Sequence, residues 1–264
     1  MKNIFKLFAF SLLLLFVKIA AAQKLPRVQK VSLRGTAATA AVIGPDTIAE
    51  QFQAYNPNNR IFYTISNDDD NLYLSVGFPG WFETEKFAVG GVTFSVKTKA
   101  GKANAAFTYP VTLYTHNGIE EGIHQFSNLK DDAANNREKL AELPYIFNQK
   151  ILKTFINIAV KGATGVPDTI QAIKNNFGLK AIAAYDKNMS MVYHLTVPLK
   201  YLELNGADSF MYDLKMNGTP AVEKIAPNTY PPPIIVSAPG EINYDYEYMN
   251  SPTHATGEYK LAVK

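Results

Sequence analysis

The chain contains no cysteine among its 264 residues and only one tryptophan. Without cysteine it has no disulfide bond, no thiol nucleophile, no thiolate metal site and no cysteine-linked lipid anchor. Its fold must therefore be held together by the burial of apolar side chains.

The chain also carries little net charge. It has 26 basic and 23 acidic residues, and the first 22 residues hold three lysines and no acidic residue. Without that segment the chain is neutral. Its composition therefore favours neither nucleic acid nor an anionic membrane as a partner.

Residues 1–22 have the pattern of a signal peptide. Lys2 and Lys6 introduce an apolar run to Val17, and Ala20-Ala21-Ala22 offers the small residues that a signal peptidase reads. The run is shorter than the roughly 20 apolar residues of a permanent anchor. We expect cleavage before Gln23 and export to the periplasm, the cell surface or the medium, with an uncleaved anchor as the alternative. No later stretch is apolar enough for a membrane-spanning segment.

Alternation of apolar and polar residues dominates the chain after residue 60. Every second residue is apolar in 60–66 and in 71–78, and 67–71 between them has a turn composition. This pattern predicts a β-hairpin whose Leu72 and Leu74 face the core. Further alternating runs lie at 91–97, 107–113, 153–160, 179–185, 189–197 and 208–216. Together they predict an all-β sandwich or barrel of antiparallel strands.

One segment departs from this period. Apolar residues recur at helical spacing across 118–143, with Asn135-Asn136 as an interruption. We therefore expect a helical insertion near 118–143, consisting of one or two helices that Pro144 ends.

The composition changes again in the C-terminal extension, 220–264, which is rich in proline and tyrosine. Proline disfavours strand pairing over 220–252. The alternating segment 243–248 is either a docked edge strand or mobile. Residues 259–263 have strand propensity and could close the sheet.

The sequence motifs of common enzyme classes are absent. The chain has no G-x-S-x-G, no P-loop, no H-E-x-x-H and no G-x-G-x-x-G. We therefore expect a protein that is not an enzyme. A hydrolase that uses paired carboxylates remains an alternative, because such pairs are defined by their separation in space.

Two groups of residues invite a metal interpretation. His116, Glu120 and His124 would lie along one flank of a helix, but two helical turns span about 12 Å, too far for one ion to contact both histidines. Asp68-Asp69-Asp70 could supply oxygen ligands to calcium, but it lacks the spacing of a calcium loop, and a solvated turn explains it. We therefore predict no metal site.

A haem site is the remaining cofactor possibility. Met189 and Met191 share a face with Tyr193, opposite His194. Thioether and imidazole can both ligate haem iron, but alternating core packing explains the methionines without a cofactor. We predict no cofactor.

The single tryptophan is the first candidate for ligand contact. Trp81 lies in 78–82 (Phe-Pro-Gly-Trp-Phe), which we interpret as a loop just past a strand end. Loop aromatics on a β scaffold can form a flat platform for sugar rings. The alternative is that Trp81 closes one end of the core. Tyr73 and Tyr55 complete the predicted ligand-binding set.

Three stretches resemble secreted bacterial proteins with a DOMON-like fold, which is related to the family 9 carbohydrate-binding modules. Residues 55–76 resemble their strand–turn–strand, 86–96 the next strand, and 193–199 a late strand that ends in an apolar-Pro-Leu step. The resemblance implies a jelly-roll sandwich whose relatives bind sugars or haem. Related sugar-binding modules clamp the ligand between two tryptophans, and this chain has only Trp81, so the resemblance implies a fold and not a ligand.

We therefore expect one sandwich domain over 23–219 that acts as a secreted, non-catalytic binding module, with carbohydrate as the candidate ligand. The alternative is a structural or envelope-associated interaction protein that binds no small molecule and uses its Pro/Tyr-rich extension as the contact surface.

Overall fold

The computed structural model describes residues 32–34, 52–98, 104–111, 137–186, 190–204, 209–218 and 244–262. The predicted signal peptide, residues 1–22, lies outside these ranges. So do His116, Glu120 and His124, the residues of the metal interpretation.

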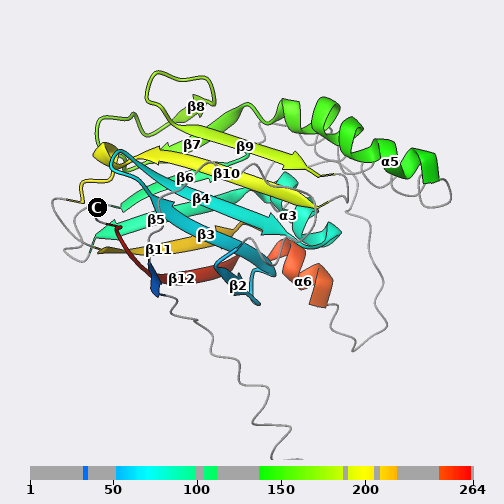
Figure 1. Ribbon diagram of the computed structural model, residues 1–264, viewed down its shortest axis with the longest axis horizontal. Helices are drawn as coiled ribbons and strands as arrows, with labels where there is room; N and C mark the ends of the chain where they lie inside the picture. Colours follow the sequence, from blue (N-terminus) through cyan, green and yellow to red (C-terminus); the bar gives the residue numbers. More distant parts are fainter. Residues whose placement is uncertain are drawn as a thin grey trace, which may run out of the picture.

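Two β-sheets packed face to face form an antiparallel sandwich, which confirms the predicted fold class (Figure 1). The five-stranded sheet has the order β2 (Ala54–Asn56), β3 (Ile61–Asn67), β4 (Asn71–Phe78), β10 (Met191–Pro198) and β9 (Lys180–Tyr185). The seven-stranded sheet has the order β1 (Ser32–Arg34), β12 (Thr253–Lys260), β11 (Ser209–Met216), β5 (Val92–Thr98), β6 (Asn104–Tyr109), β7 (Asn157–Lys161) and β8 (Ile170–Ala172). Among the described strands, β1 and β12 are the one pair that runs in parallel.

The structure confirms the predicted hairpin, formed by β3 and β4, and its predicted inward face. Ile65 pairs with Leu74, Tyr63 pairs with Val76, and all four side chains are at most 1 % exposed. Because each buried apolar side chain contributes about 1.5–3 kcal/mol, this alternation makes the hairpin a central part of the core.

Two predicted strands have different limits from those expected. The run at 107–113 ends as β6 at Tyr109, because Pro110 has no N–H to donate to a sheet. The run at 153–160 begins as β7 only at Asn157, because Leu152–Thr154 forms a 3₁₀ turn (η2).

Helix α3 (Trp81–Gly90) corrects two predictions, the loop at 78–82 and the strand at 86–96. The N–H and the hydroxyl of Thr84 both donate to the Gly80 carbonyl, at 3.2 and 2.9 Å, which begins the helix. The helix ends because Gly91 adopts φ +72° and donates its N–H to Phe87. Phe87 is fully buried and closes this end of the core.

Helix α5 (Arg137–Ile146) overlaps the end of the predicted insertion, whose earlier residues lie outside the described ranges. We expected Pro144 to end the helix, but it lies inside the helix. The chain continues to Ile146 and then widens into a π turn, Phe147–Ile151 (η1). A proline removes one helical hydrogen bond, and the wider turn follows directly after that interruption.

Helix α6 (Tyr244–Asn250) corrects both alternatives given for 243–248, a docked edge strand and a mobile segment. Strand β12 follows it and pairs with β11 along its whole length, so the extension supplies the closing strand. Among the described residues, no helix has the length and apolarity to cross a membrane.

Two asparagine side chains bind the outer edge of β9. The Asn148 amide accepts a hydrogen bond from Tyr185 N–H at 2.8 Å and donates to Tyr185 C=O at 2.9 Å. Asn175 bonds the N–H and C=O of Leu179, the residue before β9, at 3.3 and 2.9 Å. Each amide therefore occupies the place that a neighbouring strand would take.

Candidate functional site

The structure separates the three predicted ligand contacts. Tyr55 on β2 is 42 % exposed and packs on Phe62, with ring centroids 4.8 Å apart. Tyr73 lies near the other end of the same outer face, because its partner Ser66 is four residues, about 13 Å, from Phe62. Trp81 begins α3 beyond the end of β4, and its side chain lies outside the described part of the structure.

Asp68 organises the turn between β3 and β4. Its Oδ1 accepts the N–H groups of Asp70 and Asn71 at 2.9 and 2.7 Å, and its Oδ2 accepts the Tyr73 hydroxyl at 2.5 Å. The hydrogen bond from Tyr73, followed by those from the backbone, lowers the pKa of Asp68. Both carboxylate oxygens are therefore engaged in holding the turn, and no group of three metal-ligating side chains occurs within the described ranges.

A cleft of about 460 Å³ opens beside this turn, at the left end of the sandwich in Figure 1. It lies where the β3–β4 turn, the loop before β9 and the chain after β10 meet. Its lining combines an aromatic ring, carboxylates, amides and an ammonium group. The lining residues are Asp69, Asp70, Asn71, Asn176, Phe177, Gly178, Pro198, Leu199 and Lys200.

Asn175 fixes the loop that carries Phe177 into the cleft. Its Oδ1 accepts the Phe177 N–H at 3.0 Å, and its amide group donates to Ala172 C=O at 2.9 Å. Gly178 adopts φ +74°, which an L side chain rarely does, so the loop turns sharply there. The Phe177 ring packs edge-on against Tyr201, with centroids 6.3 Å apart. The aromatic wall of the cleft is therefore held on both sides.

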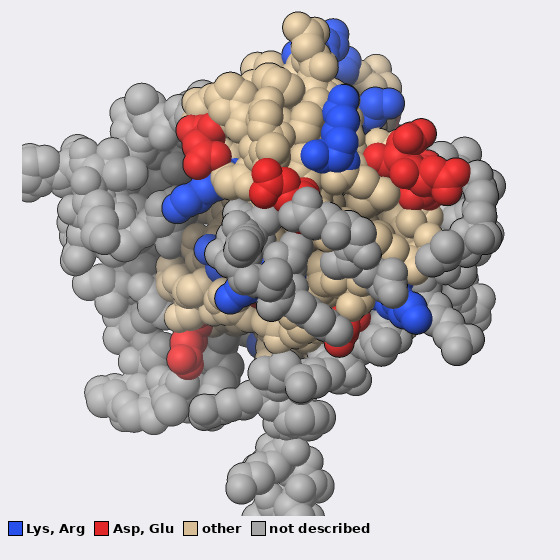
Figure 2. Space-filling view, turned by 90° about the vertical axis from the view of Figure 1, so that its left-hand side faces the viewer, with Lys and Arg blue, Asp and Glu red and all other residues tan. Residues whose placement is uncertain are grey.

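Charge at the cleft is mixed. Asp69 and Asp70 are exposed on one wall, and Lys200 is exposed on another. Figure 2 looks onto this end of the molecule and shows acidic and basic side chains interspersed. Such a surface favours a ligand recognised by hydrogen bonds over one recognised by a large charge.

The outer face of the five-stranded sheet continues from the cleft. Asn71, Tyr73 and Ser75 alternate along β4 on that face, and Ser75 Oγ shares a hydrogen bond of 2.9 Å with His194 Nδ1. Burial lowers the pKa of His194, which favours its neutral form. No outward-facing position of β3, β4 or β10 within the described ranges carries a lysine, arginine, aspartate or glutamate.

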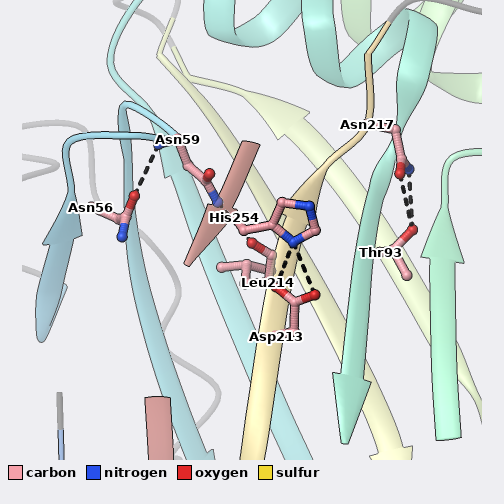
Figure 3. A network of polar contacts seen from close by, with 7 residues as sticks. All are labelled: Asn56, Asn59, Thr93, Asp213, Leu214, Asn217 and His254. Atoms are coloured by element: carbon pink, nitrogen blue, oxygen red, sulfur yellow. Dashed lines mark hydrogen bonds and ion pairs between the residues drawn. The ribbon is translucent and has the colours of Figure 1, made fainter. Parts of the chain in front are cut away.

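The outer face of the seven-stranded sheet is different. Asp213 on β11 and His254 on β12 form an exposed pair at 3.0 Å (Figure 3). The other histidine pair, Ser75 and His194, lies on the opposite side of the sandwich. The two pairs therefore do not form a catalytic triad, which requires one histidine that is hydrogen-bonded to both the serine and the carboxylate.

Lys86 is the most buried charged group, and we considered it as a reactive amine. Its side chain is fully buried, and its Nζ donates to Ser251 C=O at 2.8 Å and to Thr253 Oγ1 at 3.3 Å. The ammonium also lies 3.9 Å from the centroid of the Tyr248 ring. These contacts hold α6 and the start of β12 against α3, so we assign Lys86 a structural role.

Burial and, to a smaller extent, the positive charge of Arg60 lower the pKa of Lys86 to about 8, while Glu83 opposes the shift. The Arg60 guanidinium lies 4.4 Å from the centroid of the Tyr248 ring and 3.9 Å from the Glu83 carboxylate. Two cations therefore contact the same aromatic ring at the end of the sandwich opposite the cleft.

Asn59 connects this end of the molecule to the seven-stranded sheet. Its amide group donates to the Leu214 carbonyl at 2.8 Å, and its N–H donates to Asn56 Oδ1 at 2.9 Å (Figure 3). The Tyr248 hydroxyl donates to the Asn59 carbonyl at 2.8 Å. The turn before β3, β11 and α6 are thereby joined.

The cleft is the feature that the sequence reasoning missed. Phe177 and Lys200 lie in segments without periodic patterning, and we had interpreted the aspartate turn only as a solvated loop. The run Asn175-Asn176-Phe177-Gly178 has the composition of a turn that presents an aromatic side chain, and it was the available signal. For the haem interpretation, Met191 is buried in the core and His194 faces outward, and Met189 lies outside the described residues.

No protein-family model, curated protein or solved structure matches this chain.

Proposed function

We propose that the protein is an exported, non-catalytic module that binds a saccharide in the cleft at the β3–β4 turn. The observation that carries the proposal is the lining of that cleft, in which Phe177 meets polar residues from two other segments of the chain. Sugars present apolar C–H faces that pack on aromatic rings and hydroxyls that bond to carboxylates and amides. Ligand sites of this kind occur on loops held by a rigid scaffold.

Two features of the sequence support the same proposal. The N-terminal pattern favours export, and the strand pattern resembles DOMON-like proteins related to carbohydrate-binding modules. In this proposal Tyr73 acts from beside the cleft, through Asp68, whose turn presents Asp69 and Asp70. Trp81 and Tyr55 belong to the other end of the sheet and do not contact a ligand confined to the cleft.

The test uses residues 23–264 and a panel of soluble oligosaccharides, with thermal unfolding as the first measurement. A ligand that binds the folded state must raise its stability. Phe177→Ala should weaken binding about fivefold to tenfold, because an aromatic contact contributes about 1–1.5 kcal/mol. Phe82→Ala is the matched control, since Phe82 is 46 % exposed on α3, far from the cleft.

Unchanged thermal stability with every saccharide would reject the proposal and favour the envelope-associated interaction protein. Equal binding by the Phe177→Ala and Phe82→Ala variants would place the ligand elsewhere. Export is measured separately: the secreted protein should have the mass of residues 23–264, and retention of residues 1–22 would contradict the signal-peptide assignment.

A further inference from the structure

We infer that the ligand is an uncharged glycan chain that extends from the cleft across the outer face of the five-stranded sheet. This inference rests on the proposed function and adds the length, charge and course of the ligand. The path, called the sheet track below, consists of Phe62 and Thr64 on β3, Tyr73 and Ser75 on β4, and His194 and Thr196 on β10, with Tyr55 at its far end. Ser66 borders the path on β3 but is only 6 % exposed.

The sheet track is continuous with the cleft. Asn71 lines the cleft and begins β4, and Tyr73 and Ser75 follow it on the same face. Strand register places Ser66 and Thr196 on either side of Tyr73, in the first row beyond the cleft. A ligand that leaves the cleft along β4 therefore meets this row next.

The next two rows continue the path. Thr64 and His194 flank Ser75 in the second row. Phe62 and the Tyr55 ring that packs on it form the third, beside Gly77. From Asn71 to Gly77 the path spans about 20 Å, more than a single sugar ring occupies.

The chemistry of the sheet track fits a neutral, hydroxyl-bearing chain. Its side chains are hydroxyls, aromatic rings and one histidine whose pKa burial lowers, and none carries a fixed charge. Hydroxyl groups both donate and accept hydrogen bonds, and aromatic rings pack on the apolar faces of sugars. Tyr55 is an exposed ring at the far end, where it can bind a unit that the cleft does not reach.

The other outer face shows that this composition is not a general property of the sandwich. Outward positions of the seven-stranded sheet carry Lys97, Asp213, Lys215 and Glu258, which mark an ordinary solvated surface. On the five-stranded sheet the outward residues of β3, β4 and β10 carry no charge, and Lys180 of the neighbouring β9 borders the path beside Thr196. A neutral glycan is complementary to the three uncharged strands.

The experiment measures affinity against chain length, with cello-, xylo- and manno-oligosaccharides as neutral probes and oligogalacturonate as the charged one. Affinity for at least one neutral series should rise about tenfold or more from the shortest to the longest member, because ring contacts are added along the sheet track. Tyr55→Ala should reduce binding of the long members only, whereas Phe177→Ala should reduce binding of all.

Thr64→Arg tests the middle of the path, because it places a bulky charge on the sheet track without altering the cleft. This variant should abolish the increase in affinity with chain length. Thr256→Arg, at an outward position of β12, is the matched control and should leave that gain intact. Thermal unfolding of both variants shows that each is folded.

The outcomes separate the inference from the proposed function. Equal affinity for the shortest and longest members, or a preference for oligogalacturonate, would overturn the sheet track and leave binding in the cleft standing. Absence of binding by every probe would overturn both. If Thr64→Arg changes the mass in light scattering and not the affinity, the face is a contact between two copies of the chain and the inference is wrong.

Discussion

The two outer faces of this sandwich are built by the same alternation and carry different chemistry. On both sheets every second residue is buried, and the inward residues are apolar. The outward residues of the seven-stranded sheet include both signs of charge, whereas those of β3, β4 and β10 are uncharged and include hydroxyls, aromatic rings and a histidine, with Lys180 on the neighbouring β9. Folding requires only that the inward residues be apolar, so the outward residues record how each surface is used.

The largest expected effect on stability comes from a charge placed in the core between the two sheets. Leu74→Asp should unfold the domain, because a buried unpaired carboxylate costs several kcal/mol against a total stability of about 5–15 kcal/mol. Asp69→Ala, at an exposed position of the neighbouring turn, should leave the urea midpoint nearly unchanged. Similar midpoints for the two variants would mean that the strand register is wrong.

Lys86 is a buried charge at the end of the sandwich that carries α3 and α6, and it should affect stability more than the solvated charges do. Because the pKa of Lys86 is lowered to about 8 in the folded protein, the unfolded chain binds more protons between pH 8 and its ordinary value of 10.5. Stability should therefore rise, by roughly 1 kcal/mol, between pH 8 and 9. From about pH 9.5 the buried tyrosines oppose the rise, because burial raises the pKa values of several of them, that of Tyr109 to about 12.

Denaturant unfolding across that pH range measures the effect. Lys86→Met should remove the rise, and Lys215→Met, at an outward position of β11, should keep it. A rise that survives in the Lys86→Met protein would show that another group is responsible.

A carboxylate placed on the uncharged face should change the titration of its histidine. The lowered pKa of His194 means that the unfolded chain takes up a proton first as the pH falls below about 6.5, so stability decreases there. Ser75→Asp sets a negative charge opposite His194 and should raise that pKa, which reduces the loss. NMR titration of the ring measures the shift, and an unchanged pKa would mean that the two side chains are not neighbours.

Removal of a charge from the solvated face should have the smallest effect. Asp213→Ala breaks the exposed pair with His254, and such pairs contribute about 0–1 kcal/mol. The change in the free energy of unfolding should shrink further at high salt. A loss of more than about 2 kcal/mol would show that this face is not an ordinary solvated surface.

Sequence alternation predicted the sheets well because burial on one face of a strand determines the residue type at every second position. It located the β3–β4 hairpin, and it placed Leu72 and Leu74 in the core. It failed at α3, where Phe87 and Val89 alternate as they would in a strand, although a helix and its glycine cap bury both. It failed again at 243–248, where alternating tyrosines form α6.

The candidate site was less accessible to sequence reasoning for a physical reason. The cleft joins Asp70, Phe177 and Lys200, which are far apart in the chain and meet only because β4, β9 and β10 are neighbours in one sheet. Neither the propensities of the residues nor the period of the apolar positions indicates which strands are neighbours in the sheet. The predicted ligand contact, the single tryptophan, lies at the opposite end of β4. Composition identifies a rare residue, but it gives no information about which residues surround it.

The asparagine amides on β9 bear on what happens when many copies of this chain are close together. An edge strand with open N–H and C=O groups is a template on which another chain can add a strand, and repeated addition produces fibrils. Asn148 and Asn175 occupy those groups at Tyr185 and Leu179, so a strand arriving from another copy finds both ends of β9 already bonded. These two side chains outside the core therefore protect the β9 edge, and their removal should increase aggregation through that edge.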